Sequence, residues 1–382
     1  MTATPFVIGI DLGTTNTALA WSDTTAAAPD DRHPIEVFPL TQVVRTGEVG
    51  TQPLLPSFLY LPQPGEATAG QLQLPWDPHR AYAVGAAAKQ QGGTTPTRVV
   101  ASAKSWLCHG GGDRRAGILP FKGDEKGKKV SPLEASALYL QHLREAWNHA
   151  HAKVAEHALE KQEIVLTVPA SFDAVARALT VEAAQAAGLP HVTLLEEPQA
   201  AFYAWLDAHH ADWRDLVQVG DIILVCDVGG GTTDFTLIAV TENQGRLELH
   251  RLAVGDHILL GGDNMDLALA HLAQQKLAAS GAKLDLAQMQ ALSHGCRAAK
   301  EQLLSDLSLK SLPVSVLGRG RSVIGGALKT ELTRAEVEAV LVDGFFPICE
   351  RAAEPKRTVA LGRRTPLLPS TSPRSCAAKN PC

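Results

Sequence analysis

The sequence predicts an α/β protein, and two features of its pattern carry that prediction. Between residues 164 and 207, short apolar strands alternate with helices, which is typical of α/β folds. The alternating segments are the strands 164–168 and 192–195 and the helices 172–187 and 198–207. The second feature is a pair of glycine-rich hairpins, Asp11–Thr17 and Asp227–Asp234, each set between runs of mainly apolar residues.

In the N-terminal half, the sequence predicts one hairpin, a region of edge strands and three helices. Residues 23–79 are rich in Pro, Gly and Thr with two apolar islands, which is typical of edge strands joined by long loops. The third helix has a capping box, because Ser131 precedes Pro132 and Glu134. The predicted segments are the hairpin strands 7–10 and 18–21, the islands 35–40 and 58–61, the helices 81–91, 99–107 and 132–160, and a glycine- and charge-rich loop at 110–127.

The C-terminal half repeats the hairpin and then becomes mainly helical. The last helix again has a capping box, formed by Thr333 and Glu336. The predicted segments are the hairpin 222–240, a third strand at 247–253, helices at 263–280 and 286–304, a β-pair at 312–317 and 322–328, and a helix at 334–346. Residues 351–382 lack apolar periodicity and are rich in Arg, Pro and Ser, which is typical of a disordered tail or of a slipped reading frame. We favour a slipped frame or another truncation event.

Composition narrows the class of protein. With 382 residues the chain can form two or three domains, and 45% hydrophobic and 20% charged residues describe an ordinary globular protein. A net charge of -5 gives no basic face for nucleic acid, and the longest apolar runs are too short to span a membrane. The N-terminus lacks the basic segment of a signal peptide, and the six cysteines have neither metal-site nor disulfide-scaffold spacing. We therefore predict a cytoplasmic protein with reduced thiols and neither nucleic acid nor a membrane as a partner.

The two hairpins predict a phosphate site. Glycines let backbone N–H groups face a ligand, threonine hydroxyls add donors, and a nearby aspartate can hold a metal ion that screens phosphate charge. The alternative is that Asp11 and Asp227 only cap their turns. Because both hairpins carry the same acid at the same offset, we predict two lobes that bind one polyphosphate from opposite sides.

Five motifs in one order resemble the nucleotide-binding domain of the seventy-kilodalton heat-shock (DnaK-like) chaperones. They are Asp11-Leu12-Gly13-Thr14-Thr15, Val84-Gly85-Ala86-Ala87-Ala88-Lys89, Thr167-Val168-Pro169-Ala170, Glu197-Pro198-Gln199-Ala200-Ala201 and Asp227-Val228-Gly229-Gly230-Gly231-Thr232. The resemblance covers roughly residues 6–346. It implies an actin-like ATPase fold, with two lobes of duplicated ribonuclease-H-like sheet-and-helix units around a nucleotide cleft. We assign residues 1–190 to lobe I, 191–348 to an incomplete lobe II and 349–382 to the tail.

The resemblance also implies roles for individual residues. Those implied to contact the phosphates are Gly13, Thr14 and Thr15 from lobe I and Gly229, Gly230, Gly231 and Thr232 from lobe II. Asp11 and Asp227 would face Mg²⁺, mostly through its waters. The implied catalytic residues are Lys89, Glu197, Asp227 and Thr232. Lys89 would lie at the γ-phosphate, and Glu197 would orient the attacking water. Thr232, together with Asp234, would assist that water or a monovalent ion such as K⁺. A solvated surface lysine is the alternative for Lys89, and Glu196 stands where the family commonly has Asn.

The resemblance to the family is weaker among the residues expected near the adenine base. Gly261, Gly262 and Asp263 resemble a glycine turn beside the nucleotide, with an ordinary turn at the start of a helix, capped by Asp263, as the alternative. Lys300 falls in register with the helix that sandwiches adenine, whereas Arg297 and Glu301 are charge-swapped: they could form a local pair or contact the base differently. No Gly-Gly-x-[Ser/Thr]-Arg segment follows residue 346, where the family closes its adenosine pocket.

The resulting hypothesis is an ATP-binding and ATP-hydrolysing domain of a DnaK-like chaperone that lacks the peptide-binding domain. Its ligands would be ATP or ADP with Mg²⁺, and its protein partners a co-chaperone or a nucleotide-exchange factor. The alternatives are a catalytically inactive nucleotide-binding module, a small-molecule kinase of the same fold, and a filament-forming actin relative.

Overall fold

A computed structural model describes residues 4–26, 33–68, 70–108, 113–121, 123–124, 127–209, 212–243, 246–255, 258–318 and 326–350. Contacts divide the chain into two compact units, which we describe separately. Unit 1 comprises residues 1–90, 98–229 and 233–258, and unit 2 comprises residues 91–97, 230–232 and 259–382. The predicted tail at 351–382 lies outside the described residues. None of the described helices is both long and apolar enough to cross a membrane.

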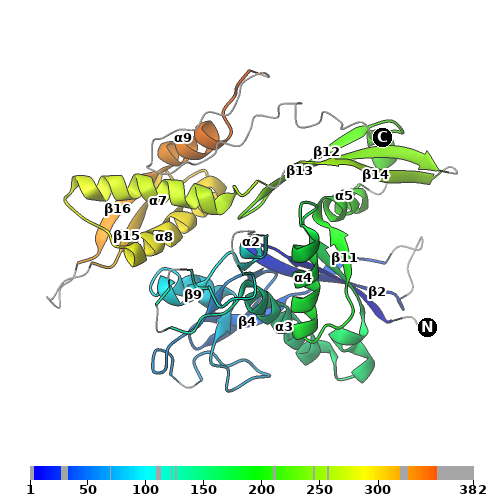
Figure 1. The fold of residues 1–382 in the computed structure, drawn as a ribbon, viewed down its shortest axis with the longest axis horizontal. Helices are drawn as coiled ribbons and strands as arrows, with labels where there is room; N and C mark the ends of the chain where they lie inside the picture. Colours follow the sequence, from blue (N-terminus) through cyan, green and yellow to red (C-terminus); the bar gives the residue numbers. More distant parts are fainter. Residues whose placement is uncertain are drawn as a thin grey trace. The chain divides into compact units, whose positions relative to one another are not determined.

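The main sheet of unit 1 is mixed, with strand order β11-β10-β1-β2-β3 and β6 paired to β2 (Figure 1). β1 and β2 form the antiparallel pair that the first hairpin predicted, and β10 and β11 run parallel to β1. The strands are β1 (Phe6–Leu12), β2 (Asn16–Asp23), β3 (Glu36–Val37), β6 (Leu55–Pro56), β10 (Glu163–Val168) and β11 (Thr193–Glu196). The order places the carboxyl ends of β1, β10 and β11 at one edge.

Helices α3 (Pro132–His151) and α4 (Ala174–Ala186) pack together, and the apolar face of α3 shares one core with β1. The predicted capping box is confirmed: the Glu134 amide donates to Ser131 Oγ at 3.0 Å, and the Ser131 amide donates to Glu134 Oε2 at 2.6 Å. The predicted extension to residue 160 is wrong, because two short 3₁₀ turns follow His151. Trp147 Nε1 on α3 donates a hydrogen bond to the His157 carbonyl at 2.8 Å, and this bond holds the turns against α3.

Residues 40–108 carry small sheets and two short helices beside this core. The predicted helix at 99–107 is wrong at its start: residues 99–100 form a strand, and Ser102 has a left-handed φ of 56° that delays the helix to Ala103. Likewise Gly85, with φ 95°, separates a strand from α1. The elements are β4 (Leu40–Arg45), β5 (Glu48–Gln52), β7 (Leu59–Tyr60), β8 (Ala83–Val84), α1 (Ala86–Gln91), a 3₁₀ turn (Pro96–Arg98), β9 (Val99–Val100) and α2 (Ala103–Cys108).

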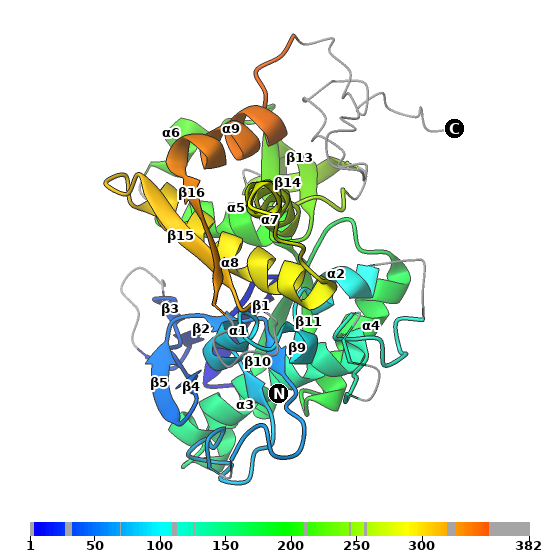
Figure 2. The same ribbon diagram turned by 90° about the vertical axis from the view of Figure 1, so that its left-hand side faces the viewer.

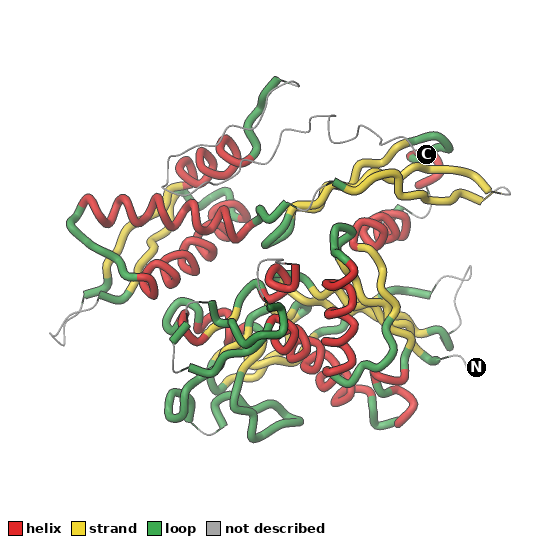
Figure 3. The backbone as a smooth tube through the Cα atoms, viewed as in Figure 1, coloured by secondary structure: helices red, strands yellow, loops and turns green. Residues whose placement is uncertain are grey.

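A second sheet of unit 1 has the antiparallel order β12-β13-β14 (Figure 3). Its strands are β12 (Ile222–Val228), β13 (Thr233–Asn243) and β14 (Arg246–Val254), and helices α5 (Glu197–Ala208) and α6 (Trp213–Leu216) precede it. Within the described residues β12 is an edge strand, whereas β1 has β10 on the corresponding side. Ile222 is 62% exposed, and Leu224, Cys226 and Val228 on the same face are also exposed. The sequence did not predict this, because a continuous apolar run is typical of a strand covered on both faces.

The described part of unit 2 contains helices α7 (Gly262–Ala279), α8 (Leu286–Ser305) and α9 (Arg334–Phe345) and the hairpin β15 (Ser311–Val316) with β16 (Leu328–Thr333) (Figure 2). α8 contacts β15, and α7 contacts α8, α9 and β16. The three helices and the Thr333 capping box confirm the prediction. Of the strand predicted at 322–328, residues 322–325 lie outside the described residues, residues 326–327 are not in a strand, and β16 begins at Leu328.

Candidate functional site

Both predicted hairpins are present and share one geometry. The last pair before the first loop is Leu12–Thr17, and the last pair before the second loop is Val228–Thr233. Each loop therefore has four residues, and each aspartate lies one pair before its loop, where Asp227 is opposite Asp234. This equal spacing confirms that the sequence repeat is a structural repeat.

The first loop is tightly held. A Cβ at Gly13 would lie 2.2 Å from the Asn16 carbonyl oxygen, so this position accepts only glycine without rearrangement. Buried Ser57 donates its amide to the Thr15 carbonyl at 2.9 Å and its hydroxyl to the Gly13 carbonyl at 2.7 Å. Sequence reasoning missed Ser57, because a serine after Pro56 in a loop-rich region gives no signal of its own.

A buried ion pair lies in unit 1 between α2 and α5. Lys104 Nζ is 2.5 Å from Glu197 Oε1, and the two side chains are only 11% and 17% exposed. Burial lowers the pKa of Lys104, but Glu197 and Asp11 outweigh it, so the net pKa is raised and the amine is charged at neutral pH. Burial likewise raises the pKa of Glu197 above its ordinary value, although Lys104 opposes the shift.

Further carboxylates act on this pair. Burial raises the pKa of Asp227, Lys104 opposes that shift, and Asp234 and Asp11 add to it. Asp11 Oδ1 accepts a hydrogen bond from Thr167 Oγ1 at 2.8 Å. Four carboxylates and one ammonium group thus form one interacting set, which leaves an excess of negative charge at the ends of β1, β11 and β12.

The donor set fits Mg²⁺, because Asp11 and Asp227 offer hard carboxylate oxygens beside glycine-rich loops. No group of three or more His, Cys, Asp or Glu side chains among the described residues could hold a metal ion directly. The role predicted for Asp11 and Asp227 in holding a hydrated cation stays a prediction.

The structure contains a buried lysine, Lys104, that the sequence did not predict for this site. Lys89 lies half-buried on α1, and Lys104 on α2 is a cation that acts on Glu197 and Asp227. The role predicted for Lys89 stays a prediction. Lys104 was missed because any lysine on a short helix is by default a surface residue.

In unit 2, the residues predicted beside the nucleotide come together around Gly230. The Asp263 amide donates to the Gly230 carbonyl at 2.7 Å, and Lys300 Nζ donates to the Gly262 carbonyl at 3.3 Å. Gly261 precedes α7 as its N-cap, and its amide donates to Asn264 Oδ1 at 2.9 Å. The alternative in which Asp263 caps this helix is therefore wrong, because Asp263 lies inside the first turn.

Besides the coulombic influence of Glu301 on the same helix, Arg297 of the charge-swapped pair on α8 has partners on α7. Arg297 forms ion pairs with Asp263 and, at 2.6 Å, with Asp266, both on α7. Lys300 Nζ lies 2.6 Å from the other oxygen of Asp266, whose side chain is buried. Asp266 was missed by sequence reasoning, although an acid on the apolar face of a helix is a signal that a partner lies opposite.

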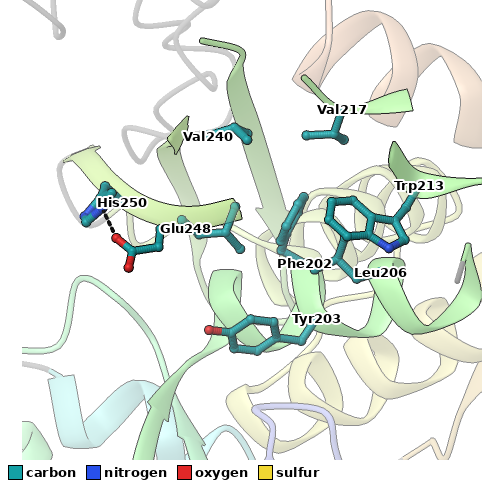
Figure 4. Close-up of a pocket in the computed structure, with 9 residues that line it drawn as sticks. Phe202, Tyr203, Leu206, Trp213, Val217, Val240, Glu248 and His250 are labelled. Atoms are coloured by element: carbon teal, nitrogen blue, oxygen red, sulfur yellow. Dashed lines mark hydrogen bonds and ion pairs between the residues drawn. The ribbon is translucent and has the colours of Figure 1, made fainter. Parts of the chain in front are cut away.

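Unit 1 also has a cavity of about 340 Å³, lined by α5, α6 and strands β13 and β14 (Figure 4). Its wall is mainly apolar, with Phe202, Leu206 and Trp213 on the helical side. At the other side Glu248 Oε2 lies 3.2 Å from His250 Nε2. None of the predicted site residues lines this cavity.

Comparison with known proteins shows the family of this chain. The sequence model of the family described as Hsp70 protein matches residues 76–359, and the chain belongs to this family. Among curated proteins, it is 32% identical over 287 residues to the chaperone protein HscA homolog of Pseudoalteromonas atlantica. That alignment covers 72% of this chain and 38% of the relative, so the chain spans about two fifths of that protein's length. Membership implies the actin-like ATPase fold, and the mixed α/β sheets of the structure are consistent with it.

Proposed function

We propose that this chain binds ATP and hydrolyses it to ADP and phosphate. The observation that carries the proposal is the buried Lys104–Glu197 pair beside Asp11 and Asp227. Phosphoryl transfer to water needs little covalent chemistry from the protein and depends on positioning and charge stabilisation. A buried cation and a carboxylate with a raised pKa, placed beside a glycine-rich loop, are suited to both tasks.

The roles of the residues follow from their chemistry. The amides of the Gly13–Thr15 loop would bind phosphate oxygens, held in place by Ser57. Glu197 would accept a hydrogen bond from the attacking water and orient it, and Lys104 would stabilise the negative charge of the transferred group. Bound Mg²⁺ would screen the phosphate charges, with Asp11 and Asp227 holding its waters. Gly229–Thr232, Asp234 and Lys300 are proposed as further nucleotide contacts, and a monovalent ion such as K⁺ is proposed beside Asp234.

We further propose that the nucleotide site serves a DnaK-like chaperone of the cytoplasm, regulated by a co-chaperone or nucleotide-exchange factor. The support is family membership together with the printed name of the bacterial relative, a chaperone protein.

The test is single-turnover hydrolysis of radiolabelled ATP with Lys104→Ala, Glu197→Gln and Lys89→Ala. Loss of one preorganised charge contact typically reduces the rate by about 10²–10³-fold, and we expect this for Lys104→Ala and Glu197→Gln. Lys161→Ala is the matched control, because Lys161 also pairs with a glutamate, at 3.0 Å, but is exposed. Unchanged turnover in Lys104→Ala with a large loss in Lys89→Ala would return the role to Lys89. A wild-type chain that binds ATP without turnover would be the non-catalytic module instead.

A further inference from the structure

The residue beside Glu197 makes an unusual set of contacts. Glu196 ends β11 and is the N-cap residue of α5, yet its side chain does not cap the helix. Its Oε1 accepts a hydrogen bond from Arg177 Nη2 at 2.8 Å and also pairs with Arg251 Nη1. The Glu196 side chain is only 14% exposed, so two guanidinium groups converge on a mostly buried carboxylate.

The two arginines come from different parts of unit 1. Arg177 lies on α4 and also donates to the carbonyls of Ala170, at 3.3 Å, and Phe172, at 3.2 Å, in the segment after β10. Arg251 lies on β14, where it is paired with Ile238 of β13. Glu196 therefore connects the end of β11 with α4 on one side and with the second sheet on the other.

This connection lies next to the proposed catalytic groups. Glu197 is the first residue of α5, so its backbone position is set by the end of β11. The second sheet carries Asp227 on β12, two strands away from Arg251. An ionic contact between Glu196 and Arg251 thus joins the strand end that presents Glu197 to the sheet that presents Asp227.

We propose that Glu196, held by Arg177 and Arg251, is a positioning residue that fixes Glu197 relative to Asp227. The proposal rests on the proposed function, because its effect is on hydrolysis. Asparagine, which the family resemblance places at this position, has no charge to bind two guanidinium groups. We call Glu196, Arg177 and Arg251 together the clamp.

The first measurement compares single-turnover hydrolysis and ATP affinity in Glu196→Gln and Glu196→Asn. We expect the rate to fall about tenfold while the Kd for ATP changes less than threefold, because the clamp acts on Glu197 and touches no ligand. In the Glu197→Gln background, Glu196→Gln should cause no further loss of rate, since Glu196 acts through Glu197. Arg251→Met should reproduce the loss, and it should not add to Glu196→Gln. The matched control is Glu182→Gln, which breaks an exposed pair between Arg115 and α4.

The second measurement tests the clamp without depending on catalysis. Hydrogen exchange followed by mass spectrometry should show faster exchange at the start of α5 and along β14 in Glu196→Gln, and unchanged exchange there in Glu182→Gln. If Glu197→Gln lowers turnover about 10²–10³-fold while Glu196→Gln changes neither rate nor exchange, the clamp is refuted and the proposed function stands. If the wild-type chain shows no turnover, the proposed function fails, and the exchange result alone decides whether the clamp exists. If Glu196→Gln lowers the rate equally in the wild type and in the Glu197→Gln background, action through Glu197 is refuted.

Discussion

Replacing Lys104 by methionine should make the stability of unit 1 strongly dependent on pH. The substitution keeps most of the side-chain volume but leaves Glu197 buried without its 2.5 Å partner. Breaking a buried pair by removing one partner typically destabilises a protein by about 3–5 kcal/mol, because a buried charge is left uncompensated. Both side chains retain slight exposure, so we expect the lower end, about 3 kcal/mol at pH 8.

The sign of the pH effect follows from the direction of the pKa shift. Burial already raises the pKa of Glu197, and loss of the Lys104 charge would raise it further. A carboxyl whose pKa is higher in the folded state binds protons preferentially there, so protonation favours folding. The stability lost in Lys104→Met at pH 8 should therefore return as the pH falls through the folded-state pKa of Glu197, toward pH 5.

The assay is urea unfolding of the wild type, Lys104→Met, Glu197→Gln and the double variant at pH 8 and pH 5.5. A loss of about 3 kcal/mol lowers the urea midpoint by about 1 M or more. The double variant should recover most of this loss, because the uncompensated charge of Glu197 is removed as well. Lys161→Met, which breaks an exposed pair, should change stability by less than about 1 kcal/mol. If Lys104→Met destabilises the wild type and Glu197→Gln equally, or causes the same loss at both pH values, the reasoning is refuted.

Two further predictions concern the hairpins. Gly13→Ala should weaken ATP binding at least tenfold by calorimetry, because the added Cβ would lie 2.2 Å from the Asn16 carbonyl oxygen; unchanged affinity would show that the loop does not bind phosphate. Ile222→Lys, on the exposed apolar face of β12, should reduce self-association measured by light scattering without lowering the unfolding midpoint. The same change at exposed Val175 on α4 is the control, and an equal effect there would mean that the strand face is not the cause.

The sequence predicted those parts of the fold that local pattern determines. Strand, glycine loop and strand are contiguous in the chain, so both hairpins and their acids could be placed, as could the capped starts at Ser131 and Thr333. The end of α3 was missed because it depends on Trp147 binding a carbonyl ten residues later. Tertiary contacts of this kind override local helix propensity, so a helix end that depends on them cannot be predicted from local pattern.

Side chains whose partners are distant in sequence were harder to predict. Arg297 was expected to pair along its own helix or to contact a base, and the sequence did not predict its two partners on α7, which lie 34 and 31 residues earlier. Lys104 reaches Glu197 across 93 residues. Neither partner can be read from spacing, because helix-to-helix packing decides which charges meet.

The placement of Lys104 is itself an argument for function. Lys104 lies among four carboxylates, those of Glu197, Asp11, Asp227 and Asp234. This arrangement contributes little to the stability of the fold, because desolvation of a buried ion pair offsets much of its attraction. The excess carboxylates also repel one another. Local sequence and global packing usually agree, and where they disagree the site is commonly a functional one. The excess negative charge would be relieved by a cation that accompanies a phosphate ligand. Mg²⁺ with ATP should therefore stabilise the wild type more than it stabilises a variant in which Asp11 and Asp227 are replaced by asparagine.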